Sequence, residues 1–176
     1  RLLDHFVPKT GYQLQQAIAY GPDARQKMDI YTPGHPRRPG CTVLFLYGGR
    51  WSSGSRALYH FAWQAFASQG CVTAVADYRL YPKVRYPAFL EDSARAFVFL
   101  HRHAREYGGD PDRMFLAGHS AGAYNAVMLT VNPRFIAAAG GKPGWIKGTI
   151  GISGPYDFVP FTDADVIDIF STEKSP

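Results

Sequence analysis

Three short apolar runs and a fourth predicted strand, separated from one another by segments of helical periodicity, constrain the fold of this chain most strongly. The runs are Cys41–Leu46, Cys71–Ala76 and Arg113–Ala117, and the fourth strand is Ile146–Ile152. Short runs that are apolar without alternation are typical of strands covered on both faces. The helical segments between them are Tyr59–Ser68, Ala88–Tyr107 and Ala121–Val131. This alternation predicts an α/β fold with a parallel sheet, right-handed crossovers and a ligand site at the carboxyl ends of the strands.

The chain before the first apolar run predicts a smaller antiparallel element. Residues 1–14 have no periodic pattern and are expected to form an irregular arm. Gln15–Tyr20 and Lys27–Tyr31 then alternate apolar and polar residues around a Gly-Pro-Asp turn, as in a hairpin. Because no linker divides the remainder, residues 15–176 are expected to form one domain. The sequence from Gly154 onward predicts a loop that leads into a short amphipathic helix.

Composition and charge exclude several classes of protein. The 176 residues are 46% hydrophobic and 19% charged, which is typical of a globular domain rather than a disordered or fibrous chain. The net charge of +5 comes from scattered Lys and Arg. Its densest stretches, Arg37-Arg38 and His101–Arg105, lack interleaved aromatic residues, so we expect no nucleic-acid partner. No apolar run approaches the ~20 residues of a membrane span, so we expect no transmembrane segment. The compartment stays open between cytoplasm and export.

The two cysteines, Cys41 and Cys71, are too few for a disulfide scaffold or a zinc site. Each stands at the start of a predicted buried strand, where a free thiol behaves as a small hydrophobic residue. We therefore expect two buried thiols. A disulfide is the alternative, if the two strands are neighbours in register. The sequence indicates no metal site and no organic cofactor.

Gly118-His119-Ser120-Ala121-Gly122 is the motif with the most specific chemistry. It follows a predicted buried strand and begins a predicted helix, which is the context of the Gly-x-Ser-x-Gly nucleophile elbow. The glycines leave room for a sharp turn that raises the Ser120 hydroxyl above the backbone. The helix N-terminus behind it supplies free N–H groups. The alternative is an ordinary strand-to-helix turn with a capping serine.

A second motif, Tyr47-Gly48-Gly49-Arg50-Trp51, follows the strand Cys41–Leu46. Consecutive glycines at this point let backbone N–H groups turn toward a ligand, and an acyl-transfer enzyme has its oxyanion hole there. A Gly-Gly pair after a strand is a weak signal alone. It becomes specific because the elbow follows about seventy residues later.

Together with two further motifs, these residues resemble the α/β-hydrolase esterases of the hormone-sensitive-lipase, carboxylesterase and kynurenine-formamidase-like group. The further motifs are Asp77-Tyr-Arg-Leu-Tyr-Pro82 and Tyr86-Pro-Ala-Phe-Leu-Glu-Asp92, and the resemblance runs from about Gln26 to the last residue. It implies the α/β-hydrolase fold, a mostly parallel central sheet with helices on both faces. This chain would be the N-terminal portion of that fold, without the later strands.

The resemblance assigns Ser120 as the nucleophile and the N–H of Ala121 as one donor of the oxyanion hole. Gly48, Gly49 and Arg50 match the loop that gives the other donors, chiefly the N–H groups of Gly49 and Arg50. The same resemblance makes three charged residues structural, as a buried hydrogen-bonded group that holds the loop behind the site. These residues are Asp77, Arg79 and Asp92.

Two aromatic residues of the loop are candidates for the substrate pocket. Tyr47 stands where many relatives have His, which leaves the backbone donors in place but changes what supports the loop. Trp51 lies either near the mouth of the pocket or beneath the loop as a packing residue.

The sequence lacks a base for Ser120. In this fold the chain order is Ser, then Asp or Glu, then His. All six histidines precede Ser120: His5, His35, His60, His101, His103 and His119. We expect His119 to be packed with its side chain away from the hydroxyl, and His101 and His103 to be solvated.

The carboxylates after Ser120 do not follow a further strand, as the family's triad acid does. They are Asp157, Asp163, Asp165, Asp168 and Glu173, and residues 163–168 have the spacing of a polar helix face. Two explanations compete. The first, which we favour, is that the acid and the histidine lie beyond Pro176. The second is that the protein is a degenerate hydrolase without turnover.

The sequence therefore predicts a carboxylesterase-like serine hydrolase that cleaves a small carboxylic ester through an acyl-enzyme on Ser120. An arylformamidase-type amide hydrolase is one alternative, because the Gly-Gly-x-Trp loop occurs in both branches. A catalytically silent binding protein of the same fold is the other. The expected partner is a small-molecule ester or amide.

Overall fold

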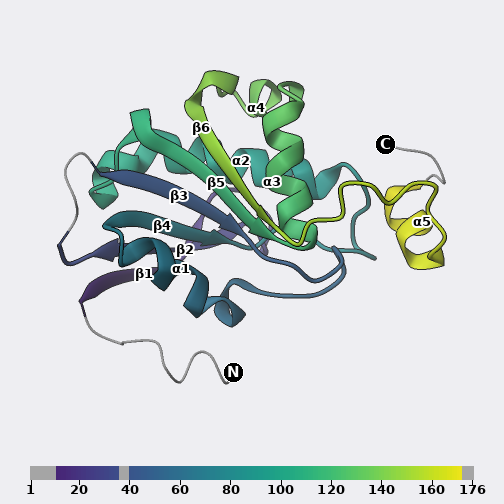
Figure 1. Cartoon of the computed structure of the whole chain (residues 1–176), viewed down its shortest axis with the longest axis horizontal. Helices are drawn as coiled ribbons and strands as arrows, with labels where there is room; N and C mark the ends of the chain where they lie inside the picture. The colour runs from purple at the N-terminus through teal and green to yellow at the C-terminus, as the bar shows by residue number, and fades with distance from the viewer. Residues whose placement is uncertain (1–10, 36–39, 172–176) are drawn as a thin grey trace.

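The computed structural model describes residues 11–35 and 40–171. Six strands form one sheet in the order β1-β2-β4-β3-β5-β6 (Figure 1). They are β1 Tyr12–Ala19, β2 Lys27–Pro33, β3 Cys41–Leu46, β4 Cys71–Ala76, β5 Met114–His119 and β6 Ile146–Ile152. The pairs β1–β2 and β2–β4 are antiparallel, and β4, β3, β5 and β6 run parallel. Expectations for the first ten residues, His5 among them, for Arg37-Arg38 and for Glu173 lie outside the described residues.

Five α-helices accompany the sheet in the described part of the chain. They are α1 His60–Ala67, α2 Ala88–His103, α3 Ala121–Val131, α4 Arg134–Ala138 and α5 Ala164–Phe170. Helix α1 packs on β2, β3 and β4, while α2 and α3 contact each other and the parallel strands. Figure 1 shows α1 in front of the sheet and α2 behind it, so helices cover both faces as the sequence predicted. None of the described helices is long and apolar enough to cross a bilayer.

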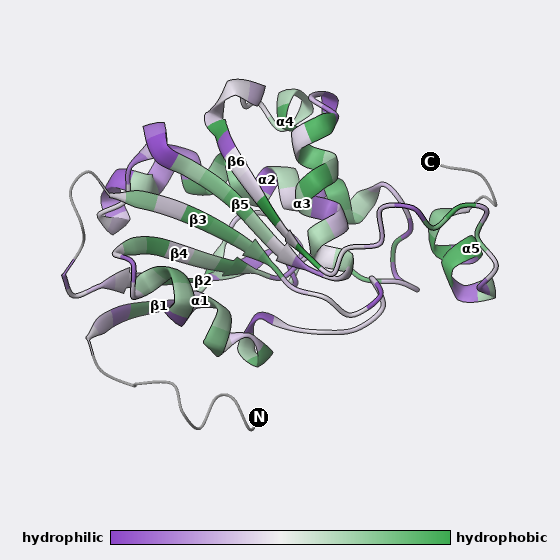
Figure 2. Ribbon diagram, viewed as in Figure 1, coloured by the Kyte–Doolittle hydropathy of each residue, from purple (hydrophilic) through white to green (hydrophobic). Residues whose placement is uncertain are grey.

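The continuous apolar runs become the central strands. Every residue of β4 is buried, and Leu44 and Leu46 of β3 have no exposed surface. Figure 2 shows the same two strands as mostly apolar. Strand β6 lies at the edge of the sheet, and its Ile150 and Ile152 are 47% and 46% exposed.

Several boundaries differ from the sequence predictions by one to four residues, and one short helix was not predicted. Strand β1 begins at Tyr12, inside the predicted irregular arm, because it pairs with β2 from that residue on. The predicted helix 88–107 ends as an α-helix at His103 and continues as a 3-10 turn over Ala104–Tyr107, which Gly108 ends with a φ of +78°. The short helix α4 was not predicted, because it adds only one turn after α3.

Cys41 and Cys71 form a disulfide, so the expectation of two buried thiols was wrong. The two residues are direct partners in the parallel β3–β4 ladder. Their Cα atoms are 4.6 Å apart, within the range that a disulfide spans. The deciding fact is the adjacency of β3 and β4 in register, which the sequence left open.

Candidate active site

Ser120 lies between the last residue of β5 and the first residue of α3. Its backbone has a φ of +52° and a ψ of −120°, a conformation that non-glycine residues rarely adopt and that costs about 1–3 kcal/mol. The Ser120 N–H donates to the carbonyl of Ile152 at 2.8 Å, which ties the turn to the end of β6. The side chain makes no capping hydrogen bond to α3, so an ordinary capping serine does not describe it.

The two glycines of the motif are required by space. A Cβ at Gly118 would lie 2.3 Å from the carbonyl oxygen of Gly122. A Cβ at Gly122 would lie 2.1 Å from the carbonyl oxygen of Leu46, at the end of β3. The elbow is therefore packed backbone against backbone, both within itself and against the strand beside it.

The loop Tyr47–Trp51 packs directly on this elbow. A Cβ at Gly48 would lie 2.9 Å from Cβ of Ser120. The next three residues all have positive φ, +142° at Gly49, +52° at Arg50 and +58° at Trp51. The carbonyl oxygen of Gly49 closes this turn, because it accepts from the N–H groups of Ser52 and Ser53 at 3.0 and 2.9 Å.

Three backbone donors beside Ser120 have no hydrogen-bond partner among the residues that the structure describes. They are the N–H groups of Gly49, Arg50 and Ala121. The N–H of Gly48 differs, because it donates to the hydroxyl of Tyr59 at 3.2 Å. Gly48 is thus a packing member of the loop, while the three unpartnered N–H groups could bind an anion.

A cavity of about 280 Å³ opens at Ser120. It is lined by Arg50, Trp51, Ser120, Ala121, Ser153, Gly154, Pro155, Phe158 and Val166. The elbow, the glycine loop and the segment after β6 therefore meet at one place. The sequence prediction missed the last segment, although β6 was expected to end at the same edge of the sheet.

Comparison with known proteins identifies the family. Residues 28–175 match the sequence model of the BD-FAE family. The chain belongs to the BD-FAE family. Its mostly parallel sheet with helices on both faces is the α/β-hydrolase fold.

Two curated relatives illustrate the similarity of this BD-FAE chain to known proteins. A probable isoprenylcysteine alpha-carbonyl methylesterase ICME of Oryza sativa subsp. japonica is 30% identical over 155 residues, which are 86% of this chain and 37% of that protein. Esterase LipC of Mycobacterium tuberculosis is 31% identical over 153 residues, which are 84% of this chain and 38% of that protein. The chain thus spans less than half the length of these relatives.

Solved structures show the same fold. A bacterial heroin esterase superposes with a TM-score of 0.64 at 27% identity, covering 76% of this chain and 43% of its own. A hyperthermophilic esterase from Pyrobaculum calidifontis gives a TM-score of 0.70 at 23% identity, covering 86% of this chain and 48% of its own.

In this BD-FAE chain, Trp51 is a packing residue that also borders the cavity. Its side chain is 3% exposed, and its indole N–H donates to Oδ1 of Asn125 at 2.9 Å. Its ring packs edge-on against Phe170 and Tyr124, with centroids 4.9 and 5.4 Å away. Trp51 is therefore both packed beneath the loop and adjacent to the cavity, the two positions that the sequence left open.

Tyr47 does not line the cavity, so the expectation that it is a pocket residue was wrong. It is fully buried, and its hydroxyl accepts from Nη2 of Arg25 at 2.6 Å. Its carbonyl accepts from the hydroxyl of Tyr78 at 2.7 Å, and the two rings stack at 4.9 Å. Burial raises the pKa of Tyr47, which therefore stays protonated. Tyr47 therefore anchors the start of the loop Tyr47–Trp51 to Arg25 and Tyr78.

The charged residues behind the loop are paired, Arg79 with Asp92 as expected and Asp77 with Arg56, a partner that was not predicted. Arg79 holds Asp92 with Nη2–Oδ1 and Nε–Oδ2 distances of 2.8 Å, and the carboxylate is 1% exposed. Asp77 accepts from the backbone N–H of Arg56 at 2.7 Å and pairs with its guanidinium, which also reaches Asp29 at 2.7 Å. Since every carboxylate is paired, this network is structural.

The helix α5 is attached to the site by its own carboxylates. Asp163 caps α5 through the N–H of Asp165 at 3.0 Å, and it accepts from Nη2 of Arg50 at 2.6 Å. The Arg50 hydrogen bond lowers the pKa of Asp163. Asp168 accepts from the Tyr81 hydroxyl at 2.5 Å and from Arg85, which lowers its pKa as well. These acids bind neighbouring loops rather than forming only a polar face.

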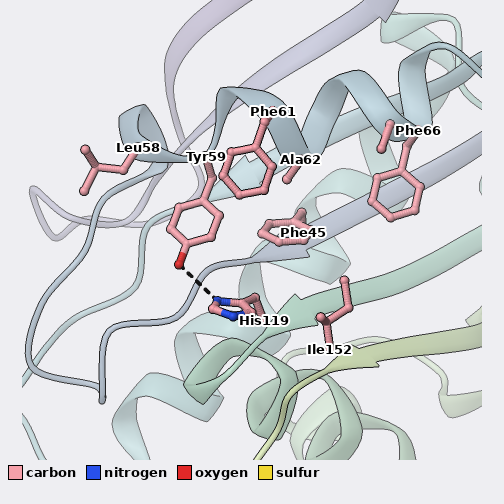
Figure 3. Close-up of a pocket in the computed structure, with 9 residues that line it drawn as sticks. Phe45, Leu58, Tyr59, Phe61, Ala62, Phe66, His119 and Ile152 are labelled. Carbon is pink, nitrogen blue, oxygen red and sulfur yellow. Dashed lines mark hydrogen bonds between the residues drawn. The ribbon is translucent and has the colours of Figure 1, made fainter. Parts of the chain in front are cut away.

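No described histidine side chain lines the cavity at Ser120. His119 faces a second, apolar cavity of about 580 Å³, where its Nδ1 lies 3.3 Å from the Tyr59 hydroxyl (Figure 3). His101 is half-buried rather than fully solvated, because its ring stacks on Trp145 at 3.6 Å, and burial lowers its pKa. His103 is half-buried and contacts Glu106 at 2.9 Å.

Proposed function

We propose that this chain carries the nucleophile and the oxyanion hole of a serine esterase that cleaves a small carboxylic ester. The observation that carries the proposal is a strained, uncapped Ser120 beside three unpartnered backbone N–H groups. The names of the relatives, a methylesterase and an esterase, support an ester as the substrate class.

The geometry fits acyl transfer. Ser120 Oγ attacks the acyl carbon of the ester while a base removes its proton. The carbonyl oxygen becomes an anion that accepts hydrogen bonds from the N–H groups of Gly49, Arg50 and Ala121. The C–O bond to the alcohol then breaks as the alcohol takes up the proton, and water later hydrolyses the acyl-enzyme. Each backbone donor to the oxyanion is expected to lower the activation free energy of acylation by about 3–4 kcal/mol.

The proton must pass through a group that the described residues do not supply. A serine hydroxyl without a base attacks poorly, because it keeps the pKa of an alcohol. We therefore propose that a histidine and its acid partner, outside the described residues, complete the site. The cavity lining favours a small apolar group, since five of its nine lining residues are apolar side chains: Trp51, Ala121, Pro155, Phe158 and Val166.

Hydrolysis of p-nitrophenyl acetate by the full-length protein tests the proposal, together with labelling by a fluorophosphonate and mapping of the labelled peptide. Ser120→Ala should abolish both signals. Ser68→Ala is the matched control, because Ser68 is exposed at the end of α1 and does not line the cavity, so it should leave both signals intact. Undiminished turnover by Ser120→Ala would refute the role of Ser120. Absence of turnover and of labelling in the unmodified protein would favour the silent binding protein.

A further inference from the structure

One hydroxyl joins the two halves of the proposed site. Tyr59 precedes α1, and its Oη accepts the N–H of Gly48 at 3.2 Å. The same oxygen lies 3.3 Å from Nδ1 of His119, the residue before Ser120. Figure 3 shows the Tyr59 hydroxyl pointing at the His119 ring from the α1 side of the cavity. The glycine loop and the elbow are therefore bridged by a side chain from a third element.

The hydrogen-bonding capacity of the three groups matches this bridge. A tyrosine hydroxyl has one proton to donate and can also accept. Because Oη accepts from Gly48, its own proton is available for Nδ1 of His119. The His119 ring has no other hydrogen bond among the described residues, so Tyr59 is the polar group that orients it there.

The bridge acts where the site tolerates little movement. A Cβ at Gly48 would be 2.9 Å from Cβ of Ser120, so the loop and the serine are in contact at this residue. Gly49 and Arg50, which carry two of the proposed oxyanion donors, follow at once. A displacement of about 1 Å in such a donor lowers the rate by about 100-fold.

Tyr47 cannot make this connection. Its hydroxyl accepts from Nη2 of Arg25 and forms no hydrogen bond with His119 or Gly48 among the described residues. Its ring instead stacks on that of Tyr59, with centroids 5.7 Å apart at 27°. Tyr59 is thereby fixed by packing, while its hydroxyl remains for the loop and the elbow.

We infer that Tyr59 is a positioning residue, whose hydroxyl holds the oxyanion-hole loop in register with Ser120. The inference rests on the proposed esterase function. It predicts that the hydroxyl affects the transition state more than the binding of substrate, because neither Tyr59 nor His119 lines the cavity at Ser120.

Steady-state hydrolysis of p-nitrophenyl acetate by full-length Tyr59→Phe tests the inference. The variant keeps the ring and loses only the hydroxyl. We expect kcat to fall by about 10- to 100-fold, with KM within about 2-fold of the parent value. Tyr107→Phe is the matched control, because Tyr107 lies in the turn after α2, and it should retain the parent kcat.

A double-mutant cycle separates positioning from a general loss of structure. If Tyr59 acts through His119, the effects of Tyr59→Phe and His119→Phe on kcat should not add. An unchanged kcat in Tyr59→Phe, a rise in KM alone, or a loss of kcat that follows the loss of folded protein would each overturn the inference. Inactivity of the unmodified protein would instead refute the proposed esterase function.

Discussion

The Cys41–Cys71 disulfide should stabilise the fold without affecting the chemistry at Ser120. The bond closes a loop with a sequence separation of 30 residues. For a loop of this length, the loss of chain entropy in the unfolded state gives about 3.6 kcal/mol at 25 °C. These 176 residues, unfolding as one unit, have an unfolding entropy of about 0.37 kcal/mol/K, so this free energy corresponds to a change in their Tm of about 10 °C.

The position of the bond predicts that catalysis will be indifferent to it. Both cysteines begin their strands, whereas Ser120 follows the carboxyl end of the parallel strand β5. A strand of six residues is about 17 Å long. The bond and the Ser120 hydroxyl therefore lie at opposite ends of the parallel strands. Removal of the bond should therefore lower Tm and leave kcat unchanged at temperatures well below the transition.

Thermal and urea unfolding of the Cys41→Ala/Cys71→Ala variant, with and without reductant, measures the effect. Reductant should lower the Tm of the parent protein to that of the variant and should not change the variant. Two titratable thiols in the unreduced, unfolded parent would refute the bond. Equal free energies of unfolding for parent and variant would refute the entropy argument, even with the bond present.

Three further predictions concern the site. Gly122→Ala should abolish activity and destabilise the fold, as circular dichroism and ester hydrolysis would show, because its Cβ would lie 2.1 Å from a carbonyl oxygen of β3. Trp51→Phe should lower the free energy of unfolding in urea by about 1–3 kcal/mol, because Oδ1 of buried Asn125 loses its donor. The lowered pKa of Asp163 means that its pairing with Arg50 is present above the unfolded value of 3.8 and is lost as the pH falls through the folded value. An NMR titration should give Asp163 a pKa below 3.8, and Arg50→Ala should raise it.

Local patterns explain which parts of the fold were predictable. Strands β3 and β4 occupy the predicted residues because each is a continuous apolar run bounded by glycine, proline or turn residues. Strand β6 also occupies its predicted residues, although its sequence includes Lys147, Gly148 and Gly151. The elbow was equally visible, since its two glycines and its position between strand and helix are all properties of adjacent residues. In these places one segment of sequence contains the whole physical cause.

The missed features depend on side chains that meet across the fold. The disulfide requires β3 and β4 to be neighbours in register, and Tyr47 is buried because Arg25, from the turn before β2, reaches its hydroxyl. Tyr59 gave no signal in the sequence, because neither of its polar partners is within ten residues. No periodicity encodes such pairs.

The loop itself shows why these long-range contacts matter for the proposed chemistry. Arg50 and Trp51 have positive φ without being glycines, at a cost of about 1–3 kcal/mol each. Burial of the Trp51 indole and its hydrogen bond to Asn125 offset that cost at the end of the loop. The hydrogen bond from Gly48 to Tyr59 offsets it at the start of the loop. In the proposed reaction the strained turn is held before substrate arrives, so its N–H groups need not reorganise as the oxyanion forms, and we expect this preorganisation to be the main source of their effect on rate. The short motif thus supplies the donors, while distant residues fix their positions.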